Sequence, residues 1–329
     1  MKILILANPT SAATDYYRTI GPFGRLAEVD KSISLEIQYP QNCKWHHMYT
    51  SDVMVVQRPN GDETLNFIAE AKRMGKKILL DIDDLLHGLT DANPASKHFN
   101  SPQVKQTMDA ALGMGDALIV STPFLAEFYA QLFEREIYVV PNCPNMQATP
   151  YGEIVPQHNP LRVFWRGSTT HLDDLYTVEK VWRLLGDDPA TSLMFIGIEK
   201  FLLPWFKGKA NFIPWQTMYQ LFEGMRNSGI DWGLYPLTLD DFNQAKSNIF
   251  AMEVLTAGGA VLAPEGLAEW EHPGVVRYKN PMHLQVLLSE IRSGKIDKQE
   301  TVKAGRAWME EHRNLDAWNL IRKSILESL

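Results

Sequence analysis

The sequence has little cysteine and no long hydrophobic run. Only Cys43 and Cys143 occur in 329 residues, which argues against a disulfide framework and points to a reducing cytoplasm. The first apolar run, Lys2–Ala7, is followed at once by Asn8 and Pro9, so it is too short for a signal peptide or a membrane span. We therefore expect a cytoplasmic protein with no membrane span.

An excess of basic charge is also missing. Lys and Arg number 32 against 39 Asp and Glu, a net charge of −7, so no global basic field indicates nucleic acid or an anionic membrane. A local basic groove remains open. No G-x-G-x-x-G follows the first apolar run, which disfavours hydride transfer by a dinucleotide enzyme. Low-complexity segments and short repeats are absent as well.

Short runs rich in Ile, Val and Leu alternate with amphipathic stretches along the whole chain. The expected strands are Lys2–Ala7, Ser34–Gln38, Asp52–Gln57, Lys77–Ile82, Ala117–Ser121, Glu136–Val140, Arg162–Trp165, Ser192–Gly197, Asn211–Pro214, Gly229–Tyr235, Ala260–Ala263 and Val275–Tyr278. Apolar strands separated by helices predict parallel sheets covered on both faces. The sequence thus predicts the α/β class, with two doubly wound Rossmann-like domains facing a cleft.

A proline-rich link from Pro141 to Pro160 indicates where the first domain gives way to the second. We expect an N-terminal domain over 1–150, a second domain over 151–310, and a closing C-terminal helix over 311–329. That helix has the option of packing back on the first domain. Ligands of open α/β sheets bind outside the carboxyl ends of the strands, so polar residues there are the site candidates.

One helix of about ten residues before Gly258 is almost wholly apolar. Glu253 is out of place in it, because a buried carboxylate needs hydrogen-bond donors. A salt bridge to Lys246 or to a neighbouring helix would satisfy it, and so would the sugar hydroxyls of a ligand. Asn243, Lys246 and Ser247 crowd the start of the helix, where free N–H groups and the dipole favour an anion.

A second cation follows the first strand of the second domain. Arg166-Gly167-Ser168 runs into Thr170 and Asp173, which fit a capping box and predict a helix start. Phosphates are often held at such strand–turn–helix junctions, although Arg166 can equally pair with Asp173 or a neighbouring acid. In the first domain, the loop after the first strand is expected to carry Tyr17 and Arg18.

Acidic and histidine side chains lie at the end of the Lys77–Ile82 strand and in the stretch after it. They are Asp81, Asp83, Asp84, His87 and His98. Asp81-Ile82-Asp83 matches the D-x-D pattern that holds Mg²⁺ or Mn²⁺ through oxygen ligands. Such a short pattern is weak, and Asp81 can also simply brace its own strand end.

Together these motifs resemble GT-B glycosyltransferases, with the retaining, glycogen-synthase-like branch nearest and a phage-type enzyme as one option. The residues that carry the resemblance are Arg166-Gly167-Ser168, His171, Asp174-Leu175, Asn243, Lys246-Ser247, Glu253, Ala257-Gly258 and Val261-Leu262-Ala263. The resemblance implies that residues 151–310 bind a nucleotide-diphosphate sugar, for example a UDP-sugar, and that residues 1–150 receive the acceptor. No other cofactor and no metal is expected.

The resemblance also implies roles for single residues. Glu253 would bind the donor ribose, Arg166 and Lys246 the pyrophosphate, and Pro214 and Trp215 would lie beside the nucleobase. Gly167, Ser168, Asn243 and Ser247 complete the donor set. The acceptor side would be formed by Tyr17, Arg18, Asp81, Asp84 and His98. Arg166 and Lys246 would stabilise the leaving group, and Asp83, Asp84, His87 and His98 are the candidates for the catalytic base.

Several points stay open at this stage. The branch commonly carries a second glutamate eight positions before the ribose ligand, where this chain has Ala245, so retention or inversion is undecided. The acceptor is unknown, as is the oligomeric state. A hydroxymethylated base in DNA is one alternative, for which a groove and stacking side chains would come from Lys97, Lys105, Arg18, Arg25, Lys44, Arg58, Trp45, His46, His47 and Tyr49. A non-catalytic nucleotide-sugar-binding protein is the other.

Overall fold

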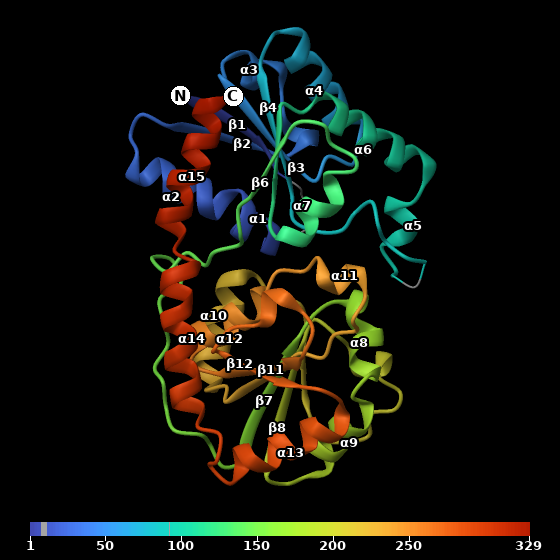
Figure 1. Ribbon diagram of the computed structural model, residues 1–329, viewed down its shortest axis with the longest axis vertical. Coiled ribbons are helices and arrows are strands. Elements are labelled where there is room, and N and C mark those ends of the chain that lie inside the picture. The colour runs from blue at the N-terminus through green and yellow to red at the C-terminus, as the bar shows by residue number, and fades with distance from the viewer. Residues whose placement is uncertain (8–11, 92) are drawn as a thin grey trace. The chain divides into compact units, whose positions relative to one another are not determined.

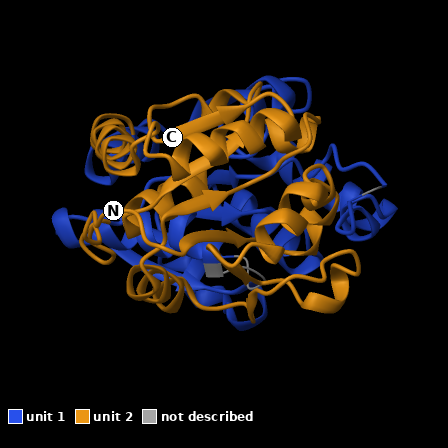
Figure 2. Cartoon of the chain, turned by 90° about the horizontal axis from the view of Figure 1, so that it is seen from below, with its two compact units in different colours: residues 1–145, 245–247, 313–329 blue, residues 146–244, 248–312 orange. Residues whose placement is uncertain are grey.

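A computed structural model describes residues 1–7, 12–91 and 93–329. The chain divides into two compact units (Figure 2). Unit 1 contains residues 1–145, 245–247 and 313–329, and unit 2 contains residues 146–244 and 248–312. The chain therefore leaves unit 2 for three residues at 245–247, and returns to unit 1 for its last helix.

Unit 1 is built on a six-stranded sheet in the order β2-β1-β3-β4-β5-β6, with every pairing parallel. Its strands are β1 (Lys2–Leu6), β2 (Ser34–Gln38), β3 (Val53–Gln57), β4 (Lys77–Ile82), β5 (Ala117–Val120) and β6 (Glu136–Val139). Its helices are α1 (Ala12–Arg18), α2 (Ile20–Val29), α3 (Trp45–Tyr49), α4 (Asp62–Arg73), α5 (Ser96–Phe99), α6 (Pro102–Met114), α7 (Pro123–Tyr129) and α15 (Leu315–Ser328).

Unit 2 repeats the plan with the order β12-β11-β10-β7-β8-β9, again all parallel (Figure 1). Its strands are β7 (Leu161–Arg166), β8 (Thr191–Ile196), β9 (Asn211–Ile213), β10 (Trp232–Leu234), β11 (Ala260–Pro264) and β12 (Val275–Tyr278). Its helices are α8 (Leu172–Tyr176), α9 (Glu179–Asp187), α10 (Met218–Ser228), α11 (Asp241–Gln244), α12 (Ile249–Ala257), α13 (Pro281–Arg292) and α14 (Lys298–His312).

The strand predictions are confirmed in both units, because each of the twelve apolar runs forms a strand at nearly its expected bounds. The strands of a sheet that is covered on both faces need apolar side chains on both faces. β3 and β5 are accordingly buried at every residue. Two Rossmann-like units of parallel strands are the fold class that the sequence predicted.

The burial of helix α12 explains why it has almost no polar residues. All of its residues from Phe250 to Ala257 are buried, so a polar face would serve no purpose. The helix ends at Gly258, whose φ of 101° lies in the left-handed region that glycine adopts without strain. Asn248 is the N-cap, so the first helical residue, Ile249, comes three positions after Lys246.

Two local predictions are wrong. The residues Asp15–Arg18 form the end of helix α1 rather than a loop. The Thr170–Asp173 capping box does not form either. Instead the hydroxyl of Ser168 accepts from Thr170 N at 3.4 Å and caps a single 3₁₀ turn over Thr169–His171 before α8. The cap is therefore a serine two residues before Thr170, and it satisfies an N–H group at the start of the turn.

The last helix, α15, belongs to unit 1 and lies beside α2 (Figure 1). Its apolar residues Ile325 and Leu326 join the core of the first sheet. Arg25 of α2 pairs with Asp316, and Lys323 pairs with Asp30. Among the described helices, none is both long and apolar enough to cross a membrane.

Candidate functional site

The candidate site in unit 2 begins with a buried ion pair. Arg166 is the last residue of β7 and Glu253 is in the middle of α12. Nε and Nη2 of Arg166 both lie 2.6 Å from Oε2 of Glu253, whose side chain is 0% exposed. The partner of this carboxylate is therefore a strand residue, where the sequence led us to expect Lys246 or a neighbouring helix. Charge-assisted bonds of this kind allow a carboxylate inside an apolar helix.

The loops after three neighbouring strands meet beside this pair. Gly197 follows β8 with a φ of +84°, and a Cβ built there would lie 2.3 Å from the Trp215 ring and 2.6 Å from the carbonyl oxygen of Gly167. Trp215 follows β9 and is 49% exposed. The guanidinium of Arg166 lies 5.9 Å from its ring centroid. A half-exposed indole thus stands next to the ion pair, with Pro214 exposed just before it.

A buried hydrogen-bond network lies at the carboxyl ends of β7 and β10. Asp174 accepts at Oδ2 from Nδ1 of His171 at 2.7 Å and at Oδ1 from Asn243 Nδ2 at 2.9 Å. Nε2 of His171 lies 3.3 Å from the hydroxyl of Tyr235. Thr238 N donates to the same Oδ1 at 2.7 Å. Asn243 therefore holds the loops of unit 2 together and belongs to α11, not to the start of α12.

The carboxylate–histidine pair His171–Asp174 is the feature that sequence reasoning left without a role. Both residues belong to the motif that carries the resemblance, but their contact was not predicted. The spacing could have predicted it, because an aspartate three residues after a histidine faces it on a helical turn. The carboxylate accepts from Nδ1 and so fixes the orientation of the ring, with Nε2 facing the hydroxyl of Tyr235.

The segment 245–247 is fixed within unit 1 by three contacts. Thr122 donates its hydroxyl to Ala245 O at 3.0 Å. Asn142 Nδ2 donates to Ser247 Oγ at 2.7 Å. Nζ of Lys246 lies 3.7 Å from Oδ1 of Asp84. Lys246 and Ser247 are thus placed by the residues that follow β4, β5 and β6.

Arg18 and Asp81 form a fully buried pair in unit 1. Nε and Nη2 of Arg18 donate to the two carboxylate oxygens of Asp81 at 2.9 Å each. Nη1 donates to Val140 O at 2.7 Å and to Asn142 Oδ1 at 3.2 Å. Burial alone would lower the pKa of Arg18, but Asp81 outweighs it and leaves that pKa raised. This pair braces the carboxyl edge of the sheet and links it to Asn142.

Arg58 forms the second pair of this edge. Its Nε lies 2.6 Å from Oδ1 of Asp83, and its Nη2 lies 3.7 Å from Asp84. Burial acts to raise the pKa of Asp83, yet the charge of Arg58 holds it below its ordinary value. Arg58 has a φ of 43°, rare for a residue with a side chain. Among the described residues, no group of three His, Cys, Asp or Glu side chains forms a metal site.

The remaining acceptor-side candidates have different environments. The side chain of His87 is 3% exposed, with Nδ1 3.1 Å from the Tyr129 hydroxyl and Nε2 3.4 Å from Asp109. Burial lowers its pKa. Tyr17 is buried in α1, whereas His98 is exposed in α5. Only His98 of these three therefore offers an exposed side chain.

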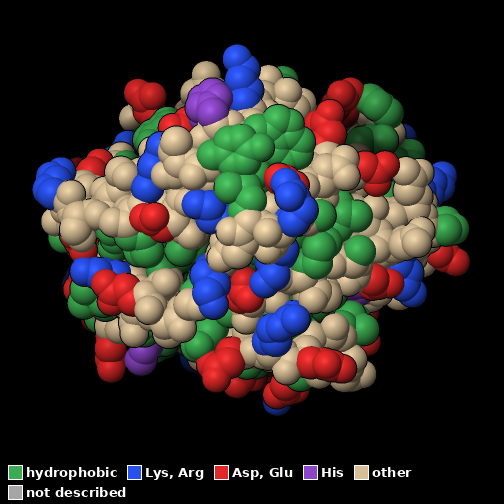
Figure 3. All heavy atoms as spheres, turned by 90° about the horizontal axis from the view of Figure 1, so that it is seen from above, with side chains coloured by type: hydrophobic (Ala, Val, Ile, Leu, Met, Phe, Trp, Pro, Cys, Tyr) green, Lys and Arg blue, Asp and Glu red, His purple; other side chains and the backbone are tan. Residues whose placement is uncertain are grey.

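The side chains expected to line a DNA groove are scattered. Arg18 is buried and bonded to Asp81, so it cannot contact a phosphate, which corrects that expectation. Arg58 is half-buried and pairs with Asp83 and Asp84. Helix α3, with Trp45 and Tyr49, precedes the amino end of β3. Lys76, just before β4, donates to the carbonyl oxygens of Tyr49 and Ser51 there. Lys and Arg are interspersed with Asp and Glu on the face seen in Figure 3. Lys97 and Lys105 are exposed in the stretch after β4.

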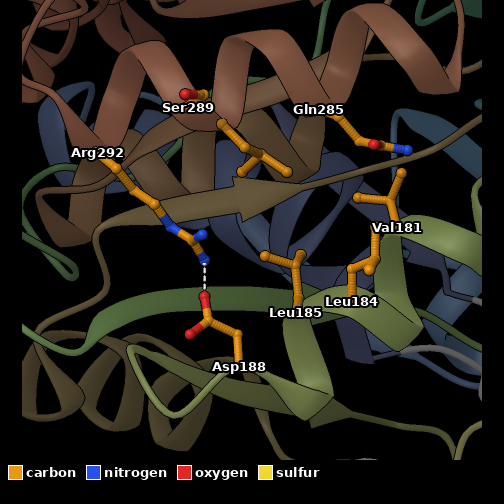
Figure 4. Close-up of a pocket in the computed structure, with 8 residues that line it drawn as sticks. Val181, Leu184, Leu185, Asp188, Gln285, Ser289 and Arg292 are labelled. Atoms are coloured by element: carbon orange, nitrogen blue, oxygen red, sulfur yellow. Dashed lines mark ion pairs between the residues drawn. The ribbon is translucent and has the colours of Figure 1, made fainter.

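Two pockets of unit 2 lie away from the carboxyl edge. One of about 370 Å³ opens between α9 and α13, with apolar Val181 and Leu185 on its wall and the Arg292–Asp188 ion pair at one end (Figure 4). Asp188 precedes β8, so this is the amino edge of the sheet. The other, also about 370 Å³, lies over the first halves of β7 and β8.

Comparison with known proteins places this geometry in a fold. No family model and no curated protein matches the sequence. Solved structures match over nearly the whole chain. HepE of Anabaena in complex with UDP and glucose has a TM-score of 0.65 at 14% identity, covering 100% of both chains. An alpha-glucosyltransferase in complex with UDP and a 13-mer DNA has a TM-score of 0.72 at 10% identity, covering 99% of both.

The chain has the GT-B fold. The T4 phage protein BGT, in complex with its UDP-glucose substrate, shares it with a TM-score of 0.61 at 13% identity and covers 98% of this chain and 99% of its own. Ligands of open α/β sheets bind outside the carboxyl ends of the strands. Arg166 and Trp215 in unit 2, and Asp83 and Asp84 in unit 1, lie at such ends.

Proposed function

We propose that the protein is a glycosyltransferase that moves a sugar from a nucleotide-diphosphate sugar to an acceptor hydroxyl. The observation that carries the proposal is the buried Arg166–Glu253 pair beside the exposed indole of Trp215. Burying two charges beside an apolar helix costs free energy of desolvation, so a buried ion pair at this edge of the sheet suggests a functional role. Similar structures are complexes with UDP or UDP-glucose, which supports a UDP-sugar donor.

The proposal gives a chemical role to the Arg166–Glu253 pair and to the residues near it in the structure or in the sequence. Glu253 accepts hydrogen bonds from the ribose hydroxyls, and Trp215 lies beside the nucleobase. Negative charge develops on the diphosphate as the bond to the sugar breaks, and a preorganised cation there lowers the barrier. Arg166 supplies one such cation. Lys246, two residues before the N-cap of α12, supplies a second, with Ser168 and Ser247 as further donors.

No metal is needed in this proposal, because arginine and lysine take the place of the cation that a D-x-D enzyme requires. For the catalytic base, Asp84, His87 and His98 remain the candidates. Asp83 is a poorer one, since Arg58 lowers its pKa and a weaker base accepts the acceptor proton less readily. The cytoplasmic location expected from the cysteine content belongs to the same proposal.

The test is a turnover assay with a panel of UDP-, ADP- and GDP-sugars in EDTA, measuring release of the nucleoside diphosphate. We expect release from one donor, slow by hydrolysis and faster with a suitable acceptor. Donor binding without release under any condition would favour a non-catalytic nucleotide-sugar-binding protein. Release restored only by Mn²⁺ would favour a metal-dependent reaction.

A hydroxymethylated base in DNA is the second candidate acceptor. The observation that favours it is the similarity to the alpha-glucosyltransferase in complex with UDP and a 13-mer DNA containing an HMU base. Exposed Lys97 and Lys105 are the described residues after β4 that fit phosphate contacts. Turnover on hydroxymethylated duplex should then fall steeply between low and moderate salt. No product at the lowest salt removes DNA from consideration.

A further inference from the structure

We propose that a small monovalent anion binds inside unit 1 against the guanidinium of Arg322. Arg322 is on α15 and is 0% exposed. Its Nη1 donates to Asn319 Oδ1 at 3.1 Å. Its Nε and Nη2 are buried, and no hydrogen-bond partner for either is found among the described residues. Buried N–H groups of a charged side chain are rarely left in that state.

Charge balance points to an anion as the missing partner. Arg18 is close enough to Arg322 to repel it, but the charge of Arg18 is matched by the bidentate Asp81. Burial, with a smaller contribution from Arg18, lowers the pKa of Arg322 to about 10, so the side chain is charged at neutral pH. The carboxylate of Asp81 also acts on Arg322, but both of its oxygens are already bonded by Arg18. Among the described residues, therefore, one of these two buried positive charges has no carboxylate of its own.

The nearby thiol of Cys143 does not supply that counter-charge. Cys143 is buried, and the positive charges of Arg322, Arg313 and Arg18 all act to lower the pKa of its thiol. Burial nevertheless dominates and raises the pKa of the thiol to about 11. The thiol is thus neutral at pH 7, and it donates weakly to Pro141 O at 3.6 Å. A lone pair of sulfur cannot neutralise a guanidinium.

These observations define the ligand. Because one charge is uncompensated, the ligand is monovalent. Because Arg18, Arg322 and Cys143 are each at most 1% exposed, the ligand is small, of halide size. A buried water can accept from one or two N–H groups but leaves the charge in place. Asn319, which accepts from Arg322, also donates to Pro22 O at 2.8 Å. The anion site would therefore adjoin the contact between α15 and the first 145 residues.

The direct experiment is anomalous diffraction from crystals of the full chain grown or soaked in sodium bromide. We expect a bromide peak in contact with Nε or Nη2 of Arg322. In parallel, Tm is measured in sodium chloride and in sodium gluconate at equal ionic strength, because gluconate is too large for the site. A ligand at ~100 times its Kd raises Tm by several degrees, so Tm should be higher in chloride.

Arg322→Met removes the charge and keeps much of the apolar stem, and should abolish the difference between the two salts. Lys323→Met is the matched control, because Lys323 is the next residue of α15 and pairs at the surface with Asp30; it should keep the difference. If bromide gives no peak at Arg322 and the wild type has the same Tm in both salts, the proposal is overturned. Both wild-type measurements decide even if Arg322→Met does not fold.

Discussion

Arg166 has two tasks that experiments can separate. Arg166 is the last residue of β7 and neutralises a carboxylate that is 0% exposed, so it contributes to stability as well as to the proposed chemistry. Arg166→Ala should cost about 3–5 kcal/mol of unfolding free energy, in addition to about a 10²-fold loss of turnover. Denaturant unfolding and donor turnover, measured on the same preparation, check both.

The variant that isolates catalysis is Arg166→Lys, which keeps the positive charge next to Glu253 but loses the planar fork. It should fold and still lose turnover by at least about tenfold. Arg162→Lys is the control, since Arg162 lies on the same face of β7 and its side chain donates to Ser228 O at 2.6 Å rather than to a carboxylate. Full turnover in a folded Arg166→Lys protein would show that the diphosphate is held elsewhere.

His87 gives a prediction about pH. Burial lowers its pKa below the ordinary value of 6.5, so the unfolded chain binds a proton before the folded chain does. The sign follows from linkage: as the pH falls below about 6.5, the unfolded state gains protons and stability is lost. His87→Gln should flatten the loss between pH 6.5 and 5 in urea unfolding. An identical pH profile for the variant would mean that His87 titrates normally.

The residue scale also marks the limit of sequence reasoning. The apolar neighbours of Glu253 were sufficient to predict that its carboxylate is buried and needs donors. Its partner is 87 positions away, and only the packing of α12 on β7 brings the two together. For the same reason Asp81 and Asp83 matched a metal motif, while their arginine partners, Arg18 and Arg58, come from other elements.

At the scale of elements, the three loops after β7, β8 and β9 depend on Gly197. A Cβ at Gly197 would meet Trp215 at 2.3 Å and Gly167 O at 2.6 Å, so Gly197→Ala should displace the indole and weaken nucleotide binding by about tenfold or more. Titration with the nucleoside diphosphate measures this.

Gly75→Ala is the matched control, because Gly75 also has a positive φ, +73°, but nothing lies within 4 Å of its Cβ position. It should destabilise by about 1 kcal/mol or less and leave binding unchanged. Equal binding by Gly197→Ala and Gly75→Ala would mean that Trp215 has no part in the nucleotide site.

The second element-scale prediction concerns the segment 245–247. Asn142 holds Ser247 and is itself oriented by Arg18, so Asn142→Ala should lower kcat with little change in the KM for the donor, if Lys246 acts mainly on the leaving group. Asn314→Ala, which removes the N-cap of α15, should lower Tm by a few degrees and leave kcat alone. The kcat of both variants decides between a positioning and a purely structural asparagine.

Elements were the level at which the sequence was most informative. Strands buried on both faces have continuous apolar runs, and a short helix with no polar face predicts its own burial. Loop conformation was less accessible, because Ser168 and Thr170 can both cap a helical turn and the better-placed hydroxyl wins. The excursion of residues 245–247 into unit 1 rests on side-chain contacts to Thr122 and Asn142 that no local pattern encodes.

At the scale of the whole molecule, two α/β units with parallel sheets give the GT-B fold. Fold alone does not give function, which therefore rests on the residues at the carboxyl edge of the second sheet. The acidic net charge of −7 adds that any binding of DNA would depend on a few local cations rather than on the overall field.

Equilibrium titration of the full chain with nucleoside diphosphates in EDTA tests the central claim most directly. The account predicts saturable binding of one of UDP, ADP or GDP, with UDP the first to try. Glu253→Gln should weaken that binding by about tenfold or more, because the side chain that accepts from the ribose hydroxyls loses its negative charge. Failure of the folded wild-type chain to bind any of the three, with or without Mg²⁺, would contradict the account.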